Sequence, residues 1–198
     1  MNTRKHTGHV ATSLIGVGGA VGVEKRHWFV AVVKHNTEKA SAQKLAKQGY
    51  ECYVACQPEY RIWKNGRKAK VDRIVIPSII FIYCTESERR PLLNFPYIFR
   101  FLTDKAELPN QFGKSIAIIP EKQIKTLKFM LGNSDTTISF VNRIYRVGEK
   151  IKVIRGKLLG LEGEVLTSND GQTDIFVSLG ILGCAKVSIN PIDLEPIK

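Results

Sequence analysis

The chain has 198 residues, which is enough for one large domain or two small ones that each bury a core without disulfide bonds. The composition is that of an ordinary globular protein, and no transmembrane span is evident. The net charge of +12 lies entirely in residues 1–130, which hold 22 Lys and Arg against 10 Asp and Glu, whereas residues 131–198 hold 8 of each. A basic part joined to a neutral part predicts that the first faces a polyanion and the second faces a protein, although a basic surface without a nucleic-acid role has the same composition.

The first 26 residues are predicted to form a flexible leader. Arg4, Lys5 and His6 precede a glycine-rich apolar run over 10–23 that is similar to the charged and apolar regions of a signal peptide. The glycines of this run break any helix that it would form, and no small-x-small cleavage site precedes Glu24. A leader over 1–26 is therefore favoured over an export signal.

Catalysis and metal binding are not expected. The four cysteines include no Cys-x-x-Cys pair and have no histidine nearby, so buried thiols in a reducing cytoplasm are the expectation. No nucleophile motif or phosphate-binding loop is present, and general acid–base work would fall on carboxylates with no evident pairing. All four histidines lie in the leader and around the first strand: His6, His9, His27 and His35. We therefore predict a protein that is not an enzyme and needs no cofactor.

Residues 27–131 are predicted to form a first domain in which strands and helices alternate. The expected elements are a strand at 27–34, a helix at 36–48, a strand at 51–56, a hairpin at 61–76, a strand at 78–84, a helix at 86–93, a strand at 97–102 and a helix at 120–132. The hairpin turns at Asn65-Gly66, the dipeptide best suited to a two-residue type I′ turn. Its tip combines an aromatic plane with several cations, namely Trp63, Lys64, Arg67, Lys68 and Lys70.

A polar segment at 132–141 is predicted to be a linker, and residues 142–198 are predicted to form a small β-barrel. Within 147–165, the apolar residues Ile151, Val153 and Leu161 alternate with charged residues, which is typical of two short strands with one buried face. A glycine-containing loop joins these strands. The stretch resembles the KOW motif, whose central glycine would be Gly163.

This element order, with a KOW module behind a linker, resembles the NusG family of transcription elongation factors. The residues that carry the resemblance run from Trp28 to the C-terminal part: W28-F-V-A-V, Asn36-x-Glu38, Gly49-x-Glu51, Pro77 before an apolar strand, and G148-E with G-L-E-G163-E-V. The resemblance implies an α+β fold, with an NGN-type α/β sandwich of an antiparallel sheet and flanking helices, followed by a small SH3-like KOW β-barrel. The sequence around Gly49, Glu51 and Tyr53 is most similar to specialised paralogues of the UpxY and RfaH type.

The resemblance implies that the NGN-like domain docks an apolar patch on the clamp helices of the largest subunit of bacterial RNA polymerase. In the family, a Phe-Pro-Gly-Tyr segment starts the strand that builds this patch. Here the matching segment is Ile76-Pro77-Ser78-Ile79, so Ile79 and Phe81 are the candidate polymerase contacts. The alternative is that they are ordinary core residues, as at least one of each adjacent pair in an alternating strand must be.

Two regions are candidates for nucleic-acid binding. In the specialised members, the short helix after the patch strand touches the non-template DNA strand of the transcription bubble. Arg89 and Arg90 occupy that place here and would supply phosphate contacts and stacking, unless they only form a solvated helix face. The hairpin residues Trp63, Lys64, Arg67 and Lys68 are the second candidate, expected to reach upstream duplex DNA by phosphate contacts.

The barrel is expected to bind a partner through the loop 180–184. The family's general members use this loop to hold the termination factor Rho or a small-subunit ribosomal protein. Ile181 and Leu182 are the candidate partner-binding residues. Leu182 stands where the family usually has an aromatic residue and Cys184 where it usually has a cation, which argues against binding of Rho. A small-subunit ribosomal protein or another regulator is the expected partner of the barrel.

These expectations predict a cytoplasmic antitermination or elongation factor that binds RNA polymerase, suppresses pausing or termination at specific operons such as capsular polysaccharide operons, and has no membrane partner. One alternative is a general NusG-type factor. The other is a ribosome-associated or RNA-binding KOW protein, against which stands the neutral charge of residues 131–198.

Overall fold

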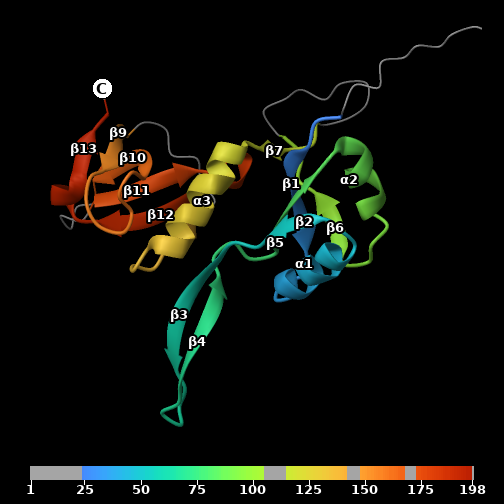
Figure 1. Cartoon of the computed structure of the whole chain (residues 1–198), viewed down its shortest axis with the longest axis horizontal. Coiled ribbons are helices and arrows are strands. Elements are labelled where there is room, and N and C mark those ends of the chain that lie inside the picture. Colours follow the sequence, from blue (N-terminus) through green and yellow to red (C-terminus); the bar gives the residue numbers. More distant parts are fainter. Residues whose placement is uncertain (1–23, 105–114, 142–147, 168–172, 198) are drawn as a thin grey trace, which may run out of the picture.

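The computed structural model of the chain describes residues 24–104, 115–141, 148–167 and 173–197. Two antiparallel sheets lie at opposite ends of these parts, with one helix between them and a long hairpin projecting from the body (Figure 1). The described residues form three α-helices: α1 (Glu38–Lys47), α2 (Glu86–Leu92) and α3 (Glu121–Asn133). None of these helices is long and apolar enough to span a membrane.

The N-terminal sheet has the strand order β2-β5-β1-β6, with β7 also paired to β1. Its strands are β1 (His27–Val33), β2 (Glu51–Tyr53), β5 (Ile79–Cys84), β6 (Ile98–Phe101) and β7 (Ile118–Ile119). Strand β1 pairs with β5 in the register Trp28↔Tyr83 and Val30↔Phe81. The central strands β1 and β5 are apolar at nearly every position because both of their faces are covered.

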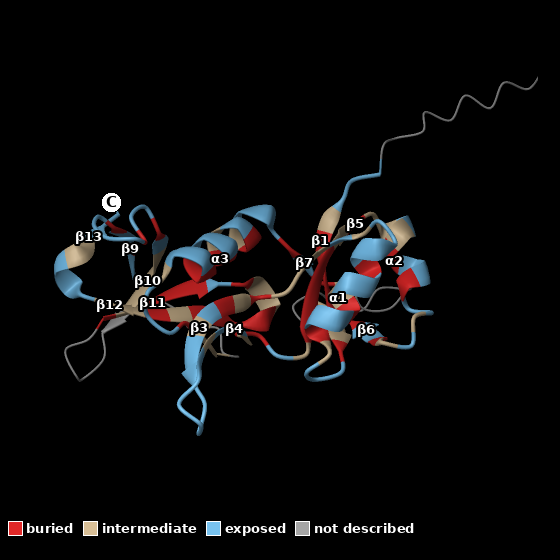
Figure 2. Cartoon of the chain, turned by 60° about the horizontal axis from the view of Figure 1, so that its bottom comes forward, coloured by how far each residue is buried: buried red, intermediate tan, exposed pale blue. Residues whose placement is uncertain are grey.

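Different helices cover the two faces of this sheet. On one face, Phe29, Ala31 and Ile82 pack with Leu45 of α1 and Leu92 of α2. The opposite face, here called the α3 face, joins a core cluster with α3, whose buried residues are Ile124, Leu127, Met130 and Leu131. Burial is concentrated in β1 and around α3, whereas the outer half of the hairpin is exposed (Figure 2).

The hairpin consists of β3 (Cys56–Ile62) and β4 (Lys68–Ile74). The single strand predicted at 51–56 is in fact divided between β2 and β3, and Ala55 at the division is fully buried. The predicted type I′ turn is wrong. Trp63 N–H donates to Arg67 O (2.9 Å) and Gly66 alone has a left-handed backbone (φ 77°), which defines a three-residue loop with a glycine bulge. The predicted hairpin itself is confirmed.

The C-terminal sheet has the antiparallel order β13-β9-β10-β11-β12-β8. Its strands are β8 (Ser139–Val141), β9 (Glu149–Val153), β10 (Glu162–Thr167), β11 (Thr173–Ser178), β12 (Cys184–Ile189) and β13 (Leu194–Pro196). Ile151, Val153 and Leu161 are buried as the alternation predicts. A Cβ at Gly163 would lie 2.5 Å from Ile175 Cγ2, so only glycine fits beside β11. Between the described parts of β13 and β8 no pairing exists, so the predicted closed barrel is not confirmed.

Helix α3 connects the two sheets. It packs against both β3 and β11, and one core cluster continues from Trp28 to Val187 around it. Two ion pairs also bridge the halves, Lys122–Glu162 (3.6 Å) and Lys157–Asp135 (2.6 Å). The segment predicted as a linker, 132–141, thus holds the end of α3 and strand β8.

Candidate nucleic-acid and protein interfaces

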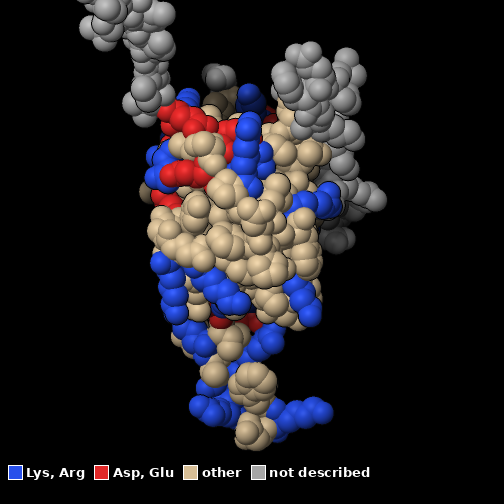
Figure 3. Space-filling view, turned by 90° about the vertical axis from the view of Figure 1, so that its right-hand side faces the viewer, with Lys and Arg blue, Asp and Glu red and all other residues tan. Residues whose placement is uncertain are grey.

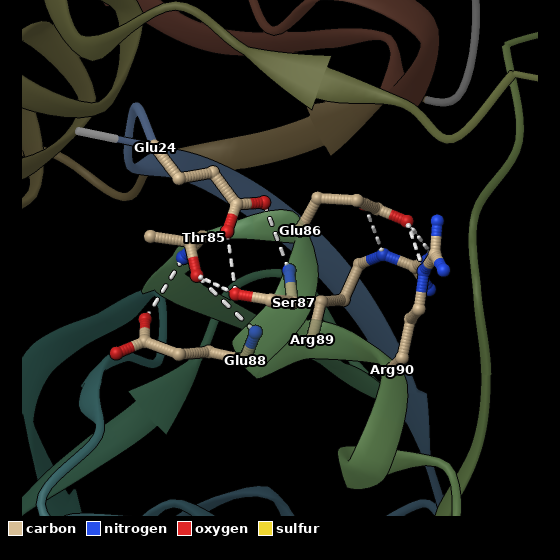
Figure 4. Close-up of polar contacts among 7 residues, drawn as sticks. All are labelled: Glu24, Thr85, Glu86, Ser87, Glu88, Arg89 and Arg90. Atoms are coloured by element: carbon tan, nitrogen blue, oxygen red, sulfur yellow. Dashed lines mark hydrogen bonds and ion pairs between the residues drawn. The ribbon is translucent and has the colours of Figure 1, made fainter. Parts of the chain in front are cut away.

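Helix α2 begins with a capping box. Thr85 Oγ1 accepts a hydrogen bond from Glu88 N–H (3.2 Å), and Glu88 Oε2 accepts one from Thr85 N–H (2.9 Å) (Figure 4). The carboxylate of Glu24 extends this cap, because it accepts hydrogen bonds from Ser87 N–H (2.9 Å) and Ser87 Oγ (2.5 Å). These hydrogen bonds lower the pKa of Glu24, and the Thr85 backbone bond lowers the pKa of Glu88.

The two arginines predicted to contact DNA have different surroundings. Arg89 is 6% exposed, and its guanidinium donates to Glu86 Oε2 (2.8 Å) and lies 5.1 Å from the Phe101 ring centroid and 5.6 Å from that of Phe29. The Arg90 side chain is 74% exposed and reaches Glu86 at 3.4 Å. Only Arg90 is therefore available to a polyanion, whereas Arg89 ties α2 to the sheet.

Charge at this end of the molecule is balanced. Arg26 pairs with Glu88 (3.0 Å), Arg89 and Arg90 share Glu86, and the hydrogen bond from Arg89 is the main cause of the lowered pKa of Glu86. Acidic and basic side chains accordingly intermingle at one end of the space-filling view, whereas Lys and Arg predominate around the hairpin at the other (Figure 3).

The hairpin tip is basic and unneutralised. Its acidic residues lie toward the base, where Glu59 binds Arg61 (2.7 Å) and Arg73 (3.1 Å), and Asp72 binds Lys39 (3.3 Å). Four exposed cations of the tip form no ion pair with any described residue: Lys64, Arg67, Lys68 and Lys70. The structure thus brings together the four hairpin residues predicted from the sequence, namely the cations Lys64, Arg67 and Lys68 and the half-exposed Trp63.

Two further side chains of the hairpin were not predicted as functional. Tyr60 is 78% exposed and Ile62 is 67% exposed, both in β3. Large apolar side chains at such exposure on a projecting element are informative. The sequence signal that marks them is the period-2 pattern of β3 and β4, which puts Tyr60 and Ile62 on one face with the lysines paired to them.

The hairpin base is fixed to the segment that follows α3. Gln57 is 5% exposed; its Nε2 donates to Thr136 O (2.7 Å) and its Oε1 accepts from Ile138 N–H (2.9 Å). Arg73 Nη2 donates to Gln57 Oε1 (3.0 Å) and to Ile138 O (2.7 Å). The hairpin therefore projects from a rigid root.

The candidate polymerase contacts lie on the α3 face but are buried, with Ile79 8% exposed and Phe81 fully buried. Phe81 packs against Tyr53, with ring centroids 5.9 Å apart. The accessible aromatic residues of this face include Tyr53 and Tyr83, which sequence reasoning missed because both lie at partly buried alternating positions. Burial raises the pKa of the Tyr53 hydroxyl.

Cations surround these aromatic rings. Lys128 Nζ lies 4.7 Å from the Trp28 ring centroid and 5.0 Å from that of Tyr53, and the Arg26 guanidinium lies 5.7 Å from that of Tyr83. Cation–π contacts of this kind hold a positive charge at the edge of the apolar patch. The face thus combines aromatic surface with positive charge.

A buried carboxylate orients the turn that leads into β5. Glu38 is fully buried, and its Oε1 accepts from Ser78 N–H (2.6 Å), while Ser78 O accepts from Val33 N–H (2.9 Å). Ser78 has φ 61°, a conformation that costs free energy for a residue with a side chain. Glu38 therefore stabilises the segment that carries Ile79.

The candidate partner loop of the C-terminal sheet forms a short 3-10 helix, Gly180–Leu182. Leu182 is 6% exposed, Ile181 is half-buried, and a Cβ at Gly180 would lie 3.5 Å from Ile119 Cδ1 of the N-terminal sheet. The structure thus places this loop against β7. Its role in binding a partner stays a prediction, for which only Ile181 is accessible.

A cleft of about 620 Å³ lies beside the contact between α3 and the C-terminal sheet and is lined by Lys122, Lys125 and Phe129 together with Glu162 and Glu164. Nothing that the structure describes fills it. No three His, Cys, Asp or Glu side chains among the described residues come together as metal ligands would.

Comparison with known proteins gives the family. The model of the family described as "Transcription termination factor nusG" matches residues 26–128. A solved structure described as "Domain interaction in Thermotoga maritima NusG" is similar at 13% identity and TM-score 0.44, covering 88% of this chain and 98% of that one. One described as an MjSpt4:Spt5 complex gives 11% identity and TM-score 0.26, covering 86% and 96%. No curated protein matches the chain. Because the family model spans more than half of its residues, the chain belongs to the NusG family.

Proposed function

We propose that the chain is a transcription antitermination or elongation factor, which binds RNA polymerase and suppresses pausing or termination without catalysing a reaction. The observation that carries the proposal is the NusG-family match over residues 26–128, the part that holds the α3 face and the hairpin. The resemblance to UpxY and RfaH paralogues supports action at specific operons, such as those for capsular polysaccharide. A cytoplasmic location follows from that role.

The polymerase contact is assigned to the α3 face, and its partner to the clamp helices of the largest subunit. Tyr53 and Tyr83 offer the accessible aromatic surface, while Ile79 and Phe81 form the layer beneath and set its shape. Aromatic side chains with a polar tip are favoured at protein interfaces that must also remain stable in water.

Contact with the non-template DNA strand is assigned to Arg90, which Arg89 helps to position by fixing α2. The hairpin, with Trp63, Lys64, Arg67 and Lys68, supplies the larger electrostatic attraction to DNA phosphates. The C-terminal sheet is proposed to be a KOW module that recruits a regulator or a small-subunit ribosomal protein through Ile181.

The test is binding of the full chain to bacterial core RNA polymerase, with and without the clamp-helix tip, in competition with general NusG. Binding that competes with general NusG and is lost when the clamp-helix tip is removed supports the proposal. A single-round transcription assay at a pause site then measures the suppression of pausing. RNA binding without polymerase binding would favour the RNA-binding KOW alternative. Displacement of general NusG at every promoter tested would favour a general factor.

A further inference from the structure

On one face of the hairpin, apolar side chains of β3 lie beside lysine side chains of β4. The register pairs Tyr60 with Lys70 and Ile62 with Lys68, and directly paired residues of antiparallel strands lie on the same face about 5 Å apart. All four side chains are exposed. An apolar row therefore runs along β3 beside a row of ammonium groups on β4.

Beyond this row, Trp63 is half exposed in the loop at the tip, where Lys64 and Arg67 add charge. Neither Tyr60 nor Trp63 takes part in any ring–ring or cation–π contact among the described residues. Both rings are thus free to receive a stacking partner.

We propose that this platform, consisting of the face Tyr60, Ile62, Lys68 and Lys70 together with Trp63 at the tip, binds single-stranded DNA, with bases stacking on the two rings and phosphates meeting the lysines. Stacking platforms beside a cationic track are the common chemistry of single-strand recognition. The inference rests on the proposed function only in choosing DNA, because unpaired DNA is what a factor on a transcribing polymerase meets.

Duplex DNA fits the platform less well. Base faces in a duplex are stacked on one another, so the apolar row would lie against the charged backbone and gain only the phosphate contacts of the lysines. An unpaired strand satisfies both rows together. The platform therefore prefers unpaired over paired DNA, which a purely electrostatic hairpin does not.

The root of the hairpin favours this function. Gln57 and Arg73 fix its base to Thr136 and Ile138, and the seven paired residues of each strand hold the two rows in one register. The platform is consequently ordered before the strand binds, which lowers the entropic cost of binding.

The test uses the full chain without polymerase and a fluorescently labelled 20-nucleotide DNA in single-stranded and duplex form, with the RNA of the same sequence as a third probe. Anisotropy gives the affinities. The chain has two tryptophans, of which Trp28 is buried and Trp63 half exposed, so quenching of tryptophan emission by an unlabelled strand reports mainly on the platform.

Variants separate stacking from charge. Tyr60→Ala and Trp63→Ala should each weaken single-strand binding about tenfold while leaving duplex binding within about twofold. Lys68→Gln with Lys70→Gln should weaken both and lower the slope of log affinity against log salt by about 1.4 for the single strand. Phe99→Ala, at an aromatic residue 61% exposed on β6, is the matched control and should change neither.

Equal affinity for paired and unpaired DNA, or aromatic variants that behave like Phe99→Ala, would overturn the inference. A tenfold preference for RNA would overturn the assignment to DNA. Because this assay contains no polymerase, a negative result does not bear on the proposed polymerase contact. Likewise, a chain that does not bind polymerase could still show the preference for single-stranded DNA. Circular dichroism verifies that each variant is folded.

Discussion

Helix α2 and the hairpin both contain runs of basic residues, but only the hairpin presents a net positive surface. Around α2, each arginine meets a carboxylate, and Arg89 is buried between two phenylalanine rings. Around the hairpin tip, four cations have no carboxylate partner among the described residues. The difference teaches that basic residues in a sequence attract a polyanion most strongly where the fold leaves them without a carboxylate partner.

The largest effect that tests this comparison is expected at Arg89. Arg89→Ala should lower the free energy of unfolding by about 2–3 kcal/mol, because it removes packing against Phe29 and Phe101 and leaves Glu86 with the exposed Arg90 alone. Urea denaturation measures the change. Arg90→Ala is the matched control and should stay within about 0.5 kcal/mol; equal destabilisation by both would contradict the division of roles.

Substitutions at the hairpin root should destabilise the protein as Arg89→Ala does, whereas substitutions at the tip should change its stability as little as Arg90→Ala does. Gln57→Ala leaves the buried Ile138 N–H without its acceptor and should cost about 1–3 kcal/mol. Lys64→Ala, at an exposed and unpaired side chain of the same hairpin, should cost less than about 0.5 kcal/mol. Thermal unfolding of the two variants provides the measurement. A stability loss at Lys64 as large as that at Gln57 would show that the tip is part of the fold's core interactions.

Charge reversal should separate the two regions in DNA binding. Lys68→Glu should weaken binding to a DNA duplex by about tenfold at low salt, since a free cation is replaced by an anion. Arg90→Glu should have a smaller effect, about threefold, because Glu86 already offsets part of the Arg90 charge. Anisotropy titrations at two salt concentrations measure both. A larger loss for Arg90→Glu would reverse the ranking of the two surfaces.

The sequence predicts the elements of both regions better than their surfaces. The apolar run of β1, the helix expected over 36–48 and the alternation of Ile151 and Val153 follow from local patterns, and the structure confirms them. Arg89 and Arg90 are chemically identical neighbours, and both can reach Glu86 by helical spacing. Only the distant rings of β1 and β6 decide which of them is buried.

The hairpin turn and the patch show the same limit. Asn65-Gly66 favours a type I′ turn, yet the pairing of Trp63 with Arg67 selects a longer loop in which glycine alone is left-handed. Ile79 and Phe81 stand in the strand that the family resemblance indicates, but both are buried in the core cluster, where Phe81 packs against Tyr53. Loop length and coverage depend on tertiary packing, which local patterns do not contain.

The smallest expected effect is the response of the α2 end to acid. Hydrogen bonds from Arg89 to Glu86 and from the Thr85 backbone to Glu88 lower the folded-state pKa of both carboxyl groups below their ordinary value. A depressed carboxyl pKa stabilises the protein above the unfolded-state pKa, and that stability is lost as the pH falls through the lower folded-state pKa.

Because both carboxylates are about 40% exposed, the effect should be under about 1 kcal/mol. Glu88→Gln should therefore flatten the fall in stability between about pH 5 and pH 3, measured by urea denaturation at each pH. Lys68→Gln, at the hairpin tip, should leave that pH profile unchanged, because its side chain is exposed and far from Glu86 and Glu88 in the fold, and should affect DNA binding instead. If Glu88→Gln does not flatten the dependence of stability on pH, the ionised carboxylate of the capping box contributes nothing measurable to the stability of the folded protein.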